Sequence, residues 1–173
     1  MTRDERIRAE EARARAALPY ATFAFGSIDP DVCRVIVDNL LFICRKFPRL
    51  GARLVAVRAV GEDLNGDGEA DWPEGTYAYH DEDATKRRST ILFRESQWLG
   101  DNDRAAHTTA HELSHAAGAE IDLHPQGKIE RARLMRRKGM DQERWADACG
   151  AFFQRRPLRP TNALSNLVWK YCR

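Results

Sequence analysis

Two histidines that stand four residues apart, His111 and His115, constrain this chain more than any other feature of its sequence. On an α-helix, residues at this spacing share one face and lie one turn apart. On a helix the two imidazole rings can therefore be directed at one ion. The surrounding pattern predicts a helix that begins at Asp101 or Asn102 and runs to about Ala117.

The residue after the first histidine is Glu112, which completes the pattern His-Glu-x-x-His. Histidine nitrogens are common zinc ligands, and a carboxylate beside them can take a proton from a water molecule on the ion. The sequence therefore predicts a zinc site with His111 and His115 as ligands and Glu112 as the general base. A catalytic zinc ion normally has three protein ligands, so the third must come from elsewhere in the chain.

Three residues could supply the third ligand, and the sequence favours Glu143. This glutamate opens a second predicted helix, capped by Asp141, and Asp147 lies one turn further along the same face. At that position Asp147 can accept the free ring N–H of a ligand histidine. His124 and Asp122, which follow the histidine pair in a predicted loop, remain open as alternatives to Glu143.

The two patterns, HExxH at residues 111–115 and ExxxD at residues 143–147, together resemble the gluzincin group of zinc metallopeptidases. In that group the glutamate on the following helix is the third zinc ligand, and the aspartate supports a ligand histidine. The sequence around the second pattern, residues 143–149, is similar to that of compact intracellular members encoded by bacteria and phages. The resemblance covers about residues 89–153. It implies a zincin-like scaffold, a small twisted β-sheet packed on the active-site helix, with Thr90–Arg94 as an edge strand along the substrate cleft.

Metzincins are a neighbouring group of zinc peptidases that share the continuation of the first motif as far as Gly118. Their third ligand stands three residues after this glycine, and that position is Ile121 in this chain. An isoleucine side chain has no atom that can bind zinc, so the sequence argues against this group.

The gluzincin resemblance implies an enzyme that hydrolyses peptide bonds. Zinc would polarise the scissile carbonyl and acidify a water molecule, while Glu112 takes a proton and passes it to the leaving amine. Two other functions remain open. One is a structural or interaction component of a phage or prophage particle that keeps the fold without general protease activity. The other is a toxin-like effector protease that acts on a single host protein.

The rest of the sequence predicts an α+β domain around these two helices. Residues 1–20 form a charged helix or arm that is polar enough to dock onto a partner, and residues 21–173 form a single zincin-like domain. The stretch between Gly118 and Asp141 is predicted to be a basic loop. The other predicted elements are helices over residues 2–17, 29–47 and 163–171 and strands over Leu54–Val60, Gly75–His80 and Ser89–Arg94.

A segment in the first half of the chain has the spacing of a calcium-binding EF-hand loop. Its oxygen-bearing side chains are Asp63, Asn65, Asp67, Glu69, Asp71 and Glu74. A strand-like run precedes the segment and Pro73 obstructs a helix after it, so a complete EF-hand is not expected. The two interpretations that remain are a structural Ca²⁺ site and a polar hairpin loop rich in turn-forming residues.

Composition excludes some partners and places the protein in a compartment. A net charge of +2 is too small to indicate a nucleic-acid partner. No stretch has the apolar length of a membrane span or the apolar core of a secretory signal. The sequence therefore predicts a cytoplasmic or virion-associated protein. Its cysteines lack CxxC spacing and are expected to be buried thiols: Cys33, Cys44, Cys149 and Cys172.

Two further roles near the motif are left undecided by the sequence. His107 lies one turn before His111 and is expected to pack beside the zinc site rather than to bind the ion. A side chain that donates a proton to the tetrahedral intermediate of peptide hydrolysis could be any of four residues. They are Tyr77, Tyr79, His80 and Tyr171.

Overall fold

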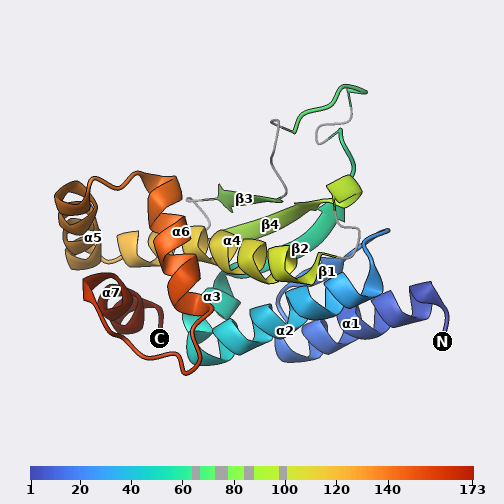
Figure 1. Cartoon of the computed structure of the whole chain (residues 1–173), viewed down its shortest axis with the longest axis horizontal. Coiled ribbons are helices and arrows are strands. Elements are labelled where there is room, and N and C mark those ends of the chain that lie inside the picture. The colour runs from blue at the N-terminus through green and yellow to red at the C-terminus, as the bar shows by residue number, and fades with distance from the viewer. Residues whose placement is uncertain (64–66, 73–77, 84–87, 98–100) are drawn as a thin grey trace.

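The computed structural model describes residues 1–63, 67–72, 78–83, 88–97 and 101–173. The described residues form seven α-helices, one short 3-10 helix and a four-stranded sheet (Figure 1), so the predicted α+β class is confirmed. The helices are α1 (Arg3–Ala17), α2 (Pro30–Lys46), α3 (Pro48–Arg53), η1 (Glu95–Gln97), α4 (Asn102–Asp122), α5 (Pro125–Lys138), α6 (Gln142–Phe153) and α7 (Ala163–Cys172). The strands are β1 (Thr22–Ala24), β2 (Leu54–Val60), β3 (Ala78–Asp83) and β4 (Arg88–Arg94).

The strands of the sheet lie in the order β1-β2-β4-β3. The first three run parallel, with Val57 opposite Ile91, and β3 is antiparallel to β4, with His80 opposite Ile91. The prediction that Thr90–Arg94 forms an edge strand is therefore wrong, because β4 has a hydrogen-bonded neighbour on each side. The edge on this side of the sheet is β3, which precedes β4 directly in the chain, whereas the other neighbour of β4 is the sequence-distant strand β2.

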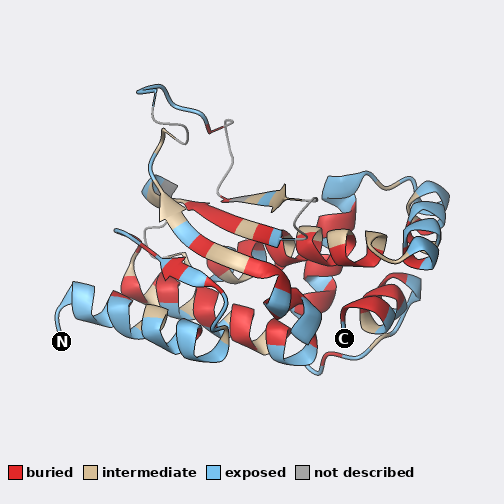
Figure 2. Ribbon diagram, turned by 180° about the vertical axis from the view of Figure 1, so that it is seen from behind, coloured by how far each residue is buried: buried red, intermediate tan, exposed pale blue. Residues whose placement is uncertain are grey.

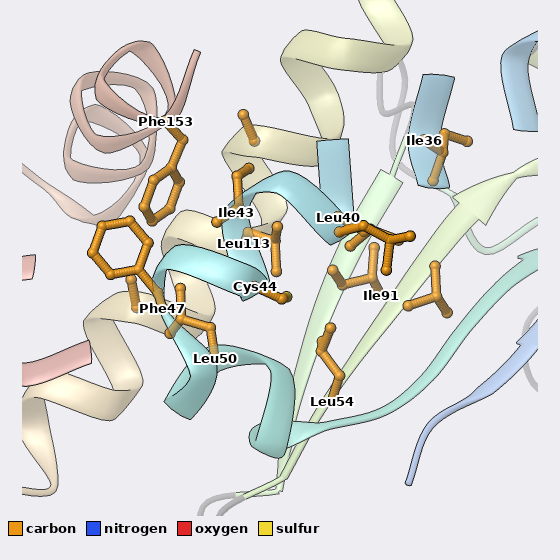
Figure 3. Packing of buried hydrophobic residues seen from close by; sticks show 14 of the residues in the cluster. Ile36, Leu40, Ile43, Cys44, Phe47, Leu50, Leu54, Ile91, Leu113 and Phe153 are labelled. Atoms are coloured by element: carbon orange, nitrogen blue, oxygen red, sulfur yellow. The ribbon is translucent and has the colours of Figure 1, made fainter. Parts of the chain in front are cut away.

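Helices α2 and α4 lie on one face of the sheet, and in the view from behind the strands stand in front of them (Figure 2). Helix α2 begins where predicted, since Asp29 accepts a hydrogen bond from the Asp31 backbone and Pro30 occupies the first turn. Figure 3 shows Leu40 of this helix beside Ile91 of β4. Both side chains are fully buried, and each stabilises the fold by roughly 1.5–3 kcal/mol.

A second part of the same core joins α2 to the C-terminal helices. Phe47 lies at the end of α2, and its ring centroid is 5.5 Å from that of Phe153 in α6 and 5.7 Å from that of Trp169 in α7. Leu50 of α3 packs next to Phe47 (Figure 3). These contacts hold α6 close to the centre of the molecule, although it is distant in sequence from α2.

The charged N-terminal segment is a helix that packs on its own chain. Thr2 caps α1 through a reciprocal pair of hydrogen bonds with Glu5, and Ile7 is one of two buried residues of this helix. Its outer face forms exposed ion pairs with α2, one of them between Arg13 and Asp38 at 2.6 Å. Within the described part of the chain, α1 is therefore docked on α2 rather than free.

The segment between Gly118 and Asp141 corrects a prediction, because it is helical almost throughout. Helix α4 continues five residues beyond the predicted end at Ala117, as far as Asp122, and α5 follows at once. Pro125 occupies the first turn of α5. Gly139 ends it with φ +61°, in the left-handed region that glycine favours. The predicted loop is wrong because α5 buries few apolar side chains, so its periodicity is weak.

The buried thiols agree with the prediction from the sequence. All four cysteines are free and buried. Burial raises the pKa of the Cys44 and Cys149 thiols to about 12, so both are uncharged at neutral pH. None of the helices in the described ranges is long and apolar enough to cross a membrane.

Candidate metal centre

The two helices that carry the predicted ligands pack closely against each other. The indole N–H of the fully buried Trp145 in α6 donates a hydrogen bond to the Ser114 carbonyl of α4, at 3.2 Å. A Cβ atom at Gly150 would lie only 3.3 Å from the backbone nitrogen and Cα of His111. Glycine at this position therefore allows the two backbones to approach. Asp141 caps α6 by accepting a hydrogen bond from the Arg144 backbone, which places Glu143 in the first turn.

Three ligand atoms converge between α4 and α6. The Nε2 atoms of His111 and His115 are 3.2 Å apart. The Glu143 carboxylate lies 3.3 Å from the first of them and 3.6 Å from the second. Two ligands of a tetrahedral ion with bonds of about 2.0–2.1 Å are separated by about 3.3 Å. The arrangement therefore fits one zinc ion held by two nitrogens and one carboxylate oxygen.

Asp147 orients the first of these histidines. Its carboxylate lies 2.9 Å from Nδ1 of His111 and accepts the N–H of that nitrogen. This hydrogen bond favours the tautomer with a proton on Nδ1 and leaves the Nε2 lone pair directed at the other ligands. The role that the sequence assigned to Asp147 thus corresponds to a contact in the structure.

Glu112 lies beside the ligands in a buried position. Only 5% of this residue is exposed, although it carries an ionisable group. Burial, with a smaller effect of the Glu143 charge, raises the pKa of Glu112 to about 8 in the metal-free chain. A cation placed among the three ligand atoms would lower this pKa and favour the carboxylate, because opposite charges stabilise each other. Glu112 therefore combines poor solvation with proximity to the ion site.

The edge strand β3 contributes a further histidine to this region. The His80 ring stacks on the His115 ring, with centroids 5.8 Å apart and an angle of 16° between the planes. Its Nε2 atom is buried and has no hydrogen-bond partner among the described residues, although the Glu82 carboxylate lies 3.5 Å away. Burial, together with the positive potential of His115 and Arg53, lowers the pKa of His80 to about 4. His80 is therefore neutral at physiological pH.

The alternative third ligands have other partners. Asp122 pairs with Arg131 at 2.5 Å, and His124 lies 3.0 Å from the Arg49 guanidinium. Neither belongs to a group of three potential ligands within the described residues. Tyr171 packs on the His124 ring, away from the histidine pair. Of the four residues considered as proton donors, Tyr77 and the side chain of Tyr79 lie outside what the structure describes.

The predicted calcium loop is described only in part, because Asn65 and Glu74 lie outside the described residues. The Asp63 carboxylate accepts a hydrogen bond from the Gly68 backbone at 2.7 Å, and Asp67 accepts one from the Glu69 backbone at 2.9 Å. Such contacts are typical of a turn-rich polar loop. Calcium binding by this segment stays a prediction.

Sequence reasoning missed two contacts around the centre. One is the stacking of His80 on His115, which depends on the pairing of β3 with β4. The other joins His107 to Gln154, whose amide lies 3.1 Å from Nδ1 of this histidine. The repeat of histidine every four residues from position 107 placed His107 on the face of His111, but nothing in the sequence indicated Gln154 as its partner.

Comparisons with protein-family models, curated proteins and solved structures found no match for this chain. Its function must therefore be argued from the geometry and chemistry of the centre itself.

Proposed function

We propose that this protein is a zinc metallopeptidase with a gluzincin-like centre, in which His111, His115 and Glu143 hold the ion. The observation that carries the proposal is the convergence of two Nε2 atoms and one carboxylate at separations of 3.2–3.6 Å. No lysine or arginine pairs with these three side chains among the described residues, so their negative charge and lone pairs lack a protein cation. A divalent metal ion supplies that charge.

The zincin-like scaffold is part of the same proposal. The HExxH helix α4 packs beside the antiparallel edge strand β3, and His80 of that strand touches His115. An edge strand has unpaired backbone N–H and C=O groups that can pair with an extended peptide. A peptide bound along β3 would therefore pass close to Glu112.

In the proposed reaction the side chains of the protein orient the ligands and transfer a proton. Zinc, when bound, supplies Lewis acidity that polarises the scissile carbonyl and lowers the pKa of water. Glu112 takes the proton of the attacking water at its carboxylate and delivers it to the leaving amine. His111 stays aligned because Asp147 accepts its ring N–H. Burial of Glu112 keeps this proton transfer away from bulk solvent.

Metal analysis tests the ligand set. The wild-type protein, purified without added metal and then dialysed against zinc, should retain one tightly bound zinc ion per chain. Glu143→Ala should lose this tightly bound ion and retain at most a weakly bound one. Asp103→Ala is a matched control, because it removes an exposed carboxylate from the first turn of α4, away from the ligands. Equal zinc content in all three proteins would exclude Glu143 as a ligand.

Peptide hydrolysis tests the reaction. Glu112→Gln should keep the zinc ion but cleave a peptide library about 10²–10⁴-fold more slowly than wild type, the usual contribution of a general base. Full activity in this variant would exclude the mechanism. A zinc-loaded wild type that cleaves no peptide would instead support the alternative function as an interaction component, for example of a phage particle.

A further inference from the structure

A second group of potential metal ligands lies one helical turn from the first. It consists of His107, His111 and Asp147, whose ligand atoms all lie within 4.8 Å of one another. His107 and Asp147 are exposed, so an ion can reach them from solvent. The centre thus contains two groups of potential ligands, and each group combines two histidines of α4 with one acidic residue of α6.

The two groups share His111, which directs a different ring nitrogen to each group. Its Nε2 atom lies 3.3 Å from Glu143, whereas its Nδ1 atom lies 2.9 Å from Asp147. Gln154 is within hydrogen-bonding distance of Nδ1 of His107. The atom of Gln154 at this contact is its amide nitrogen, so an ion on Nε2 of His107 requires the amide to turn its oxygen toward Nδ1–H.

We propose that His107, Asp147 and the Nδ1 atom of His111 form a second, weaker divalent-cation site. With the first site empty, the second has three protein ligands, namely two imidazole nitrogens and one carboxylate. With the first site occupied through Nε2, the proton on Nδ1 of His111 leaves only His107 and Asp147 for a second ion. Occupation of the first site therefore weakens the second.

The shared aspartate gives this site an effect on the first one. Asp147 accepts the His111 N–H when only the first site is filled. A second ion bound to Asp147 competes for the same carboxylate, so it weakens the contact that orients His111. Partners of this kind typically contribute 10–100-fold to metal affinity or activity. Excess zinc should consequently loosen the first ion.

Equilibrium dialysis against increasing free zinc, followed by elemental analysis, tests the proposal without any substrate. Wild type should bind one ion tightly and a second more weakly. His107→Ala should keep the tight ion and bind the second at least about tenfold more weakly, because a directly bound ligand matters at least as much as its supporting partner. His124→Ala removes a histidine outside both groups and should match wild type.

A further variant separates this proposal from the proposed function. His115→Ala removes a ligand of the first site only, so this protein should still bind one ion through the second site. The double variant His107→Ala/His115→Ala should bind none with comparable affinity. A second ion that is bound equally by wild type and His107→Ala would overturn the proposal, and so would complete loss of zinc in His115→Ala.

Discussion

Helix α4 takes part in two groups of ionisable side chains that differ in how their charge is balanced. The Arg53 group joins Arg53 of α3 to Glu82 of β3, Ser89 of β4 and Glu120 of α4 through hydrogen bonds. The histidine group consists of His111, His115, Glu143 and Asp147. The first contains its own buried cation, whereas the second has only acceptors and titratable imidazoles directed at one another.

The difference separates the Arg53 group, which serves the fold, from the histidine group, which we propose holds an ion. Arg53 is only 4% exposed, and its guanidinium ties the edge strand to the helix that carries HExxH. The Glu143 side chain, in contrast, is 72% exposed and contacts the histidines at 3.3 Å or more. A buried charge without a partner destabilises the fold, whereas an exposed carboxylate is solvated by water and can stay unpaired until an ion binds.

The largest effect on stability is expected from breaking the Arg53 group. Arg53→Met should reduce the free energy of unfolding by about 3–5 kcal/mol, because Glu82 and Glu120 are left without their cation. Denaturant titration of the zinc-free protein measures this quantity. His115→Ala, the matched change in the histidine group, should cost about 1 kcal/mol or less in the same assay.

A rescue experiment shows whether unpaired charge causes the loss. Adding Glu82→Gln and Glu120→Gln to Arg53→Met removes both negative charges and should recover part of the stability. A triple variant no more stable than Arg53→Met would mean that the lost guanidinium hydrogen bonds, rather than unpaired negative charge, account for the loss.

Zinc binding should make the histidine group contribute to the stability of the fold as well. A ligand that binds only the folded state stabilises it by about 2.7 kcal/mol at a free concentration one hundred times its dissociation constant. Wild type should therefore gain stability in zinc and lose the gain on adding a chelator. Glu143→Ala should gain less stability at the same free zinc concentration, as measured by thermal unfolding, because any ion that it still binds is held more weakly. Stabilisation of equal size in both proteins would contradict the assignment of the ligand.

A smaller effect is expected from the residue that orients His111. Asp147→Asn should weaken zinc binding about 10–100-fold, or about 1.4–2.7 kcal/mol, since an amide supports the imidazole less strongly than a carboxylate. Competition with a chromogenic chelator measures the affinity. Unchanged affinity would show that the 2.9 Å contact with His111 does not influence the ion.

The smallest effect should come from an ion pair in water. Arg13 and Asp38 are 2.6 Å apart, but their side chains are 41% and 56% exposed. Arg13→Ala should therefore change the free energy of unfolding by about 0.2–1 kcal/mol, and less at high salt. A loss as large as that for Arg53→Met would mean that burial does not decide how much an ion pair of this protein contributes to stability.

Local sequence patterns predicted the elements with strong caps or strong periodicity. Helix α2 was predicted from its Asp29 cap and apolar face, and β2 and β4 from their apolar runs. Strand β1 has only three residues, too few to show a period. The order of the strands depends on pairing between distant segments, which explains why β4 was wrongly placed at the edge.

Within the candidate site, the sequence predicted what a single helix determines. The spacing of His111 and His115 requires one shared face, and that face is present. Glu143 was favoured because it opens a predicted helix with Asp147 one turn further along, and the structure brings it to the same point. The contacts of His80 and Gln154 were not predicted, because each depends on packing between elements far apart in the chain.

The close approach of α6 to α4 at Gly150 has a consequence for the spacing of the candidate ligands, because His111 stands on one of these helices and Glu143 on the other. Even an added methyl group would press on the His111 backbone at 3.3 Å and require a shift of a few tenths of an ångström. A shift of this size is comparable with the roughly 0.2 Å tolerance of metal–ligand distances. A residue without any ligand atom therefore helps to set the distance between the two helices that carry the candidate ligands.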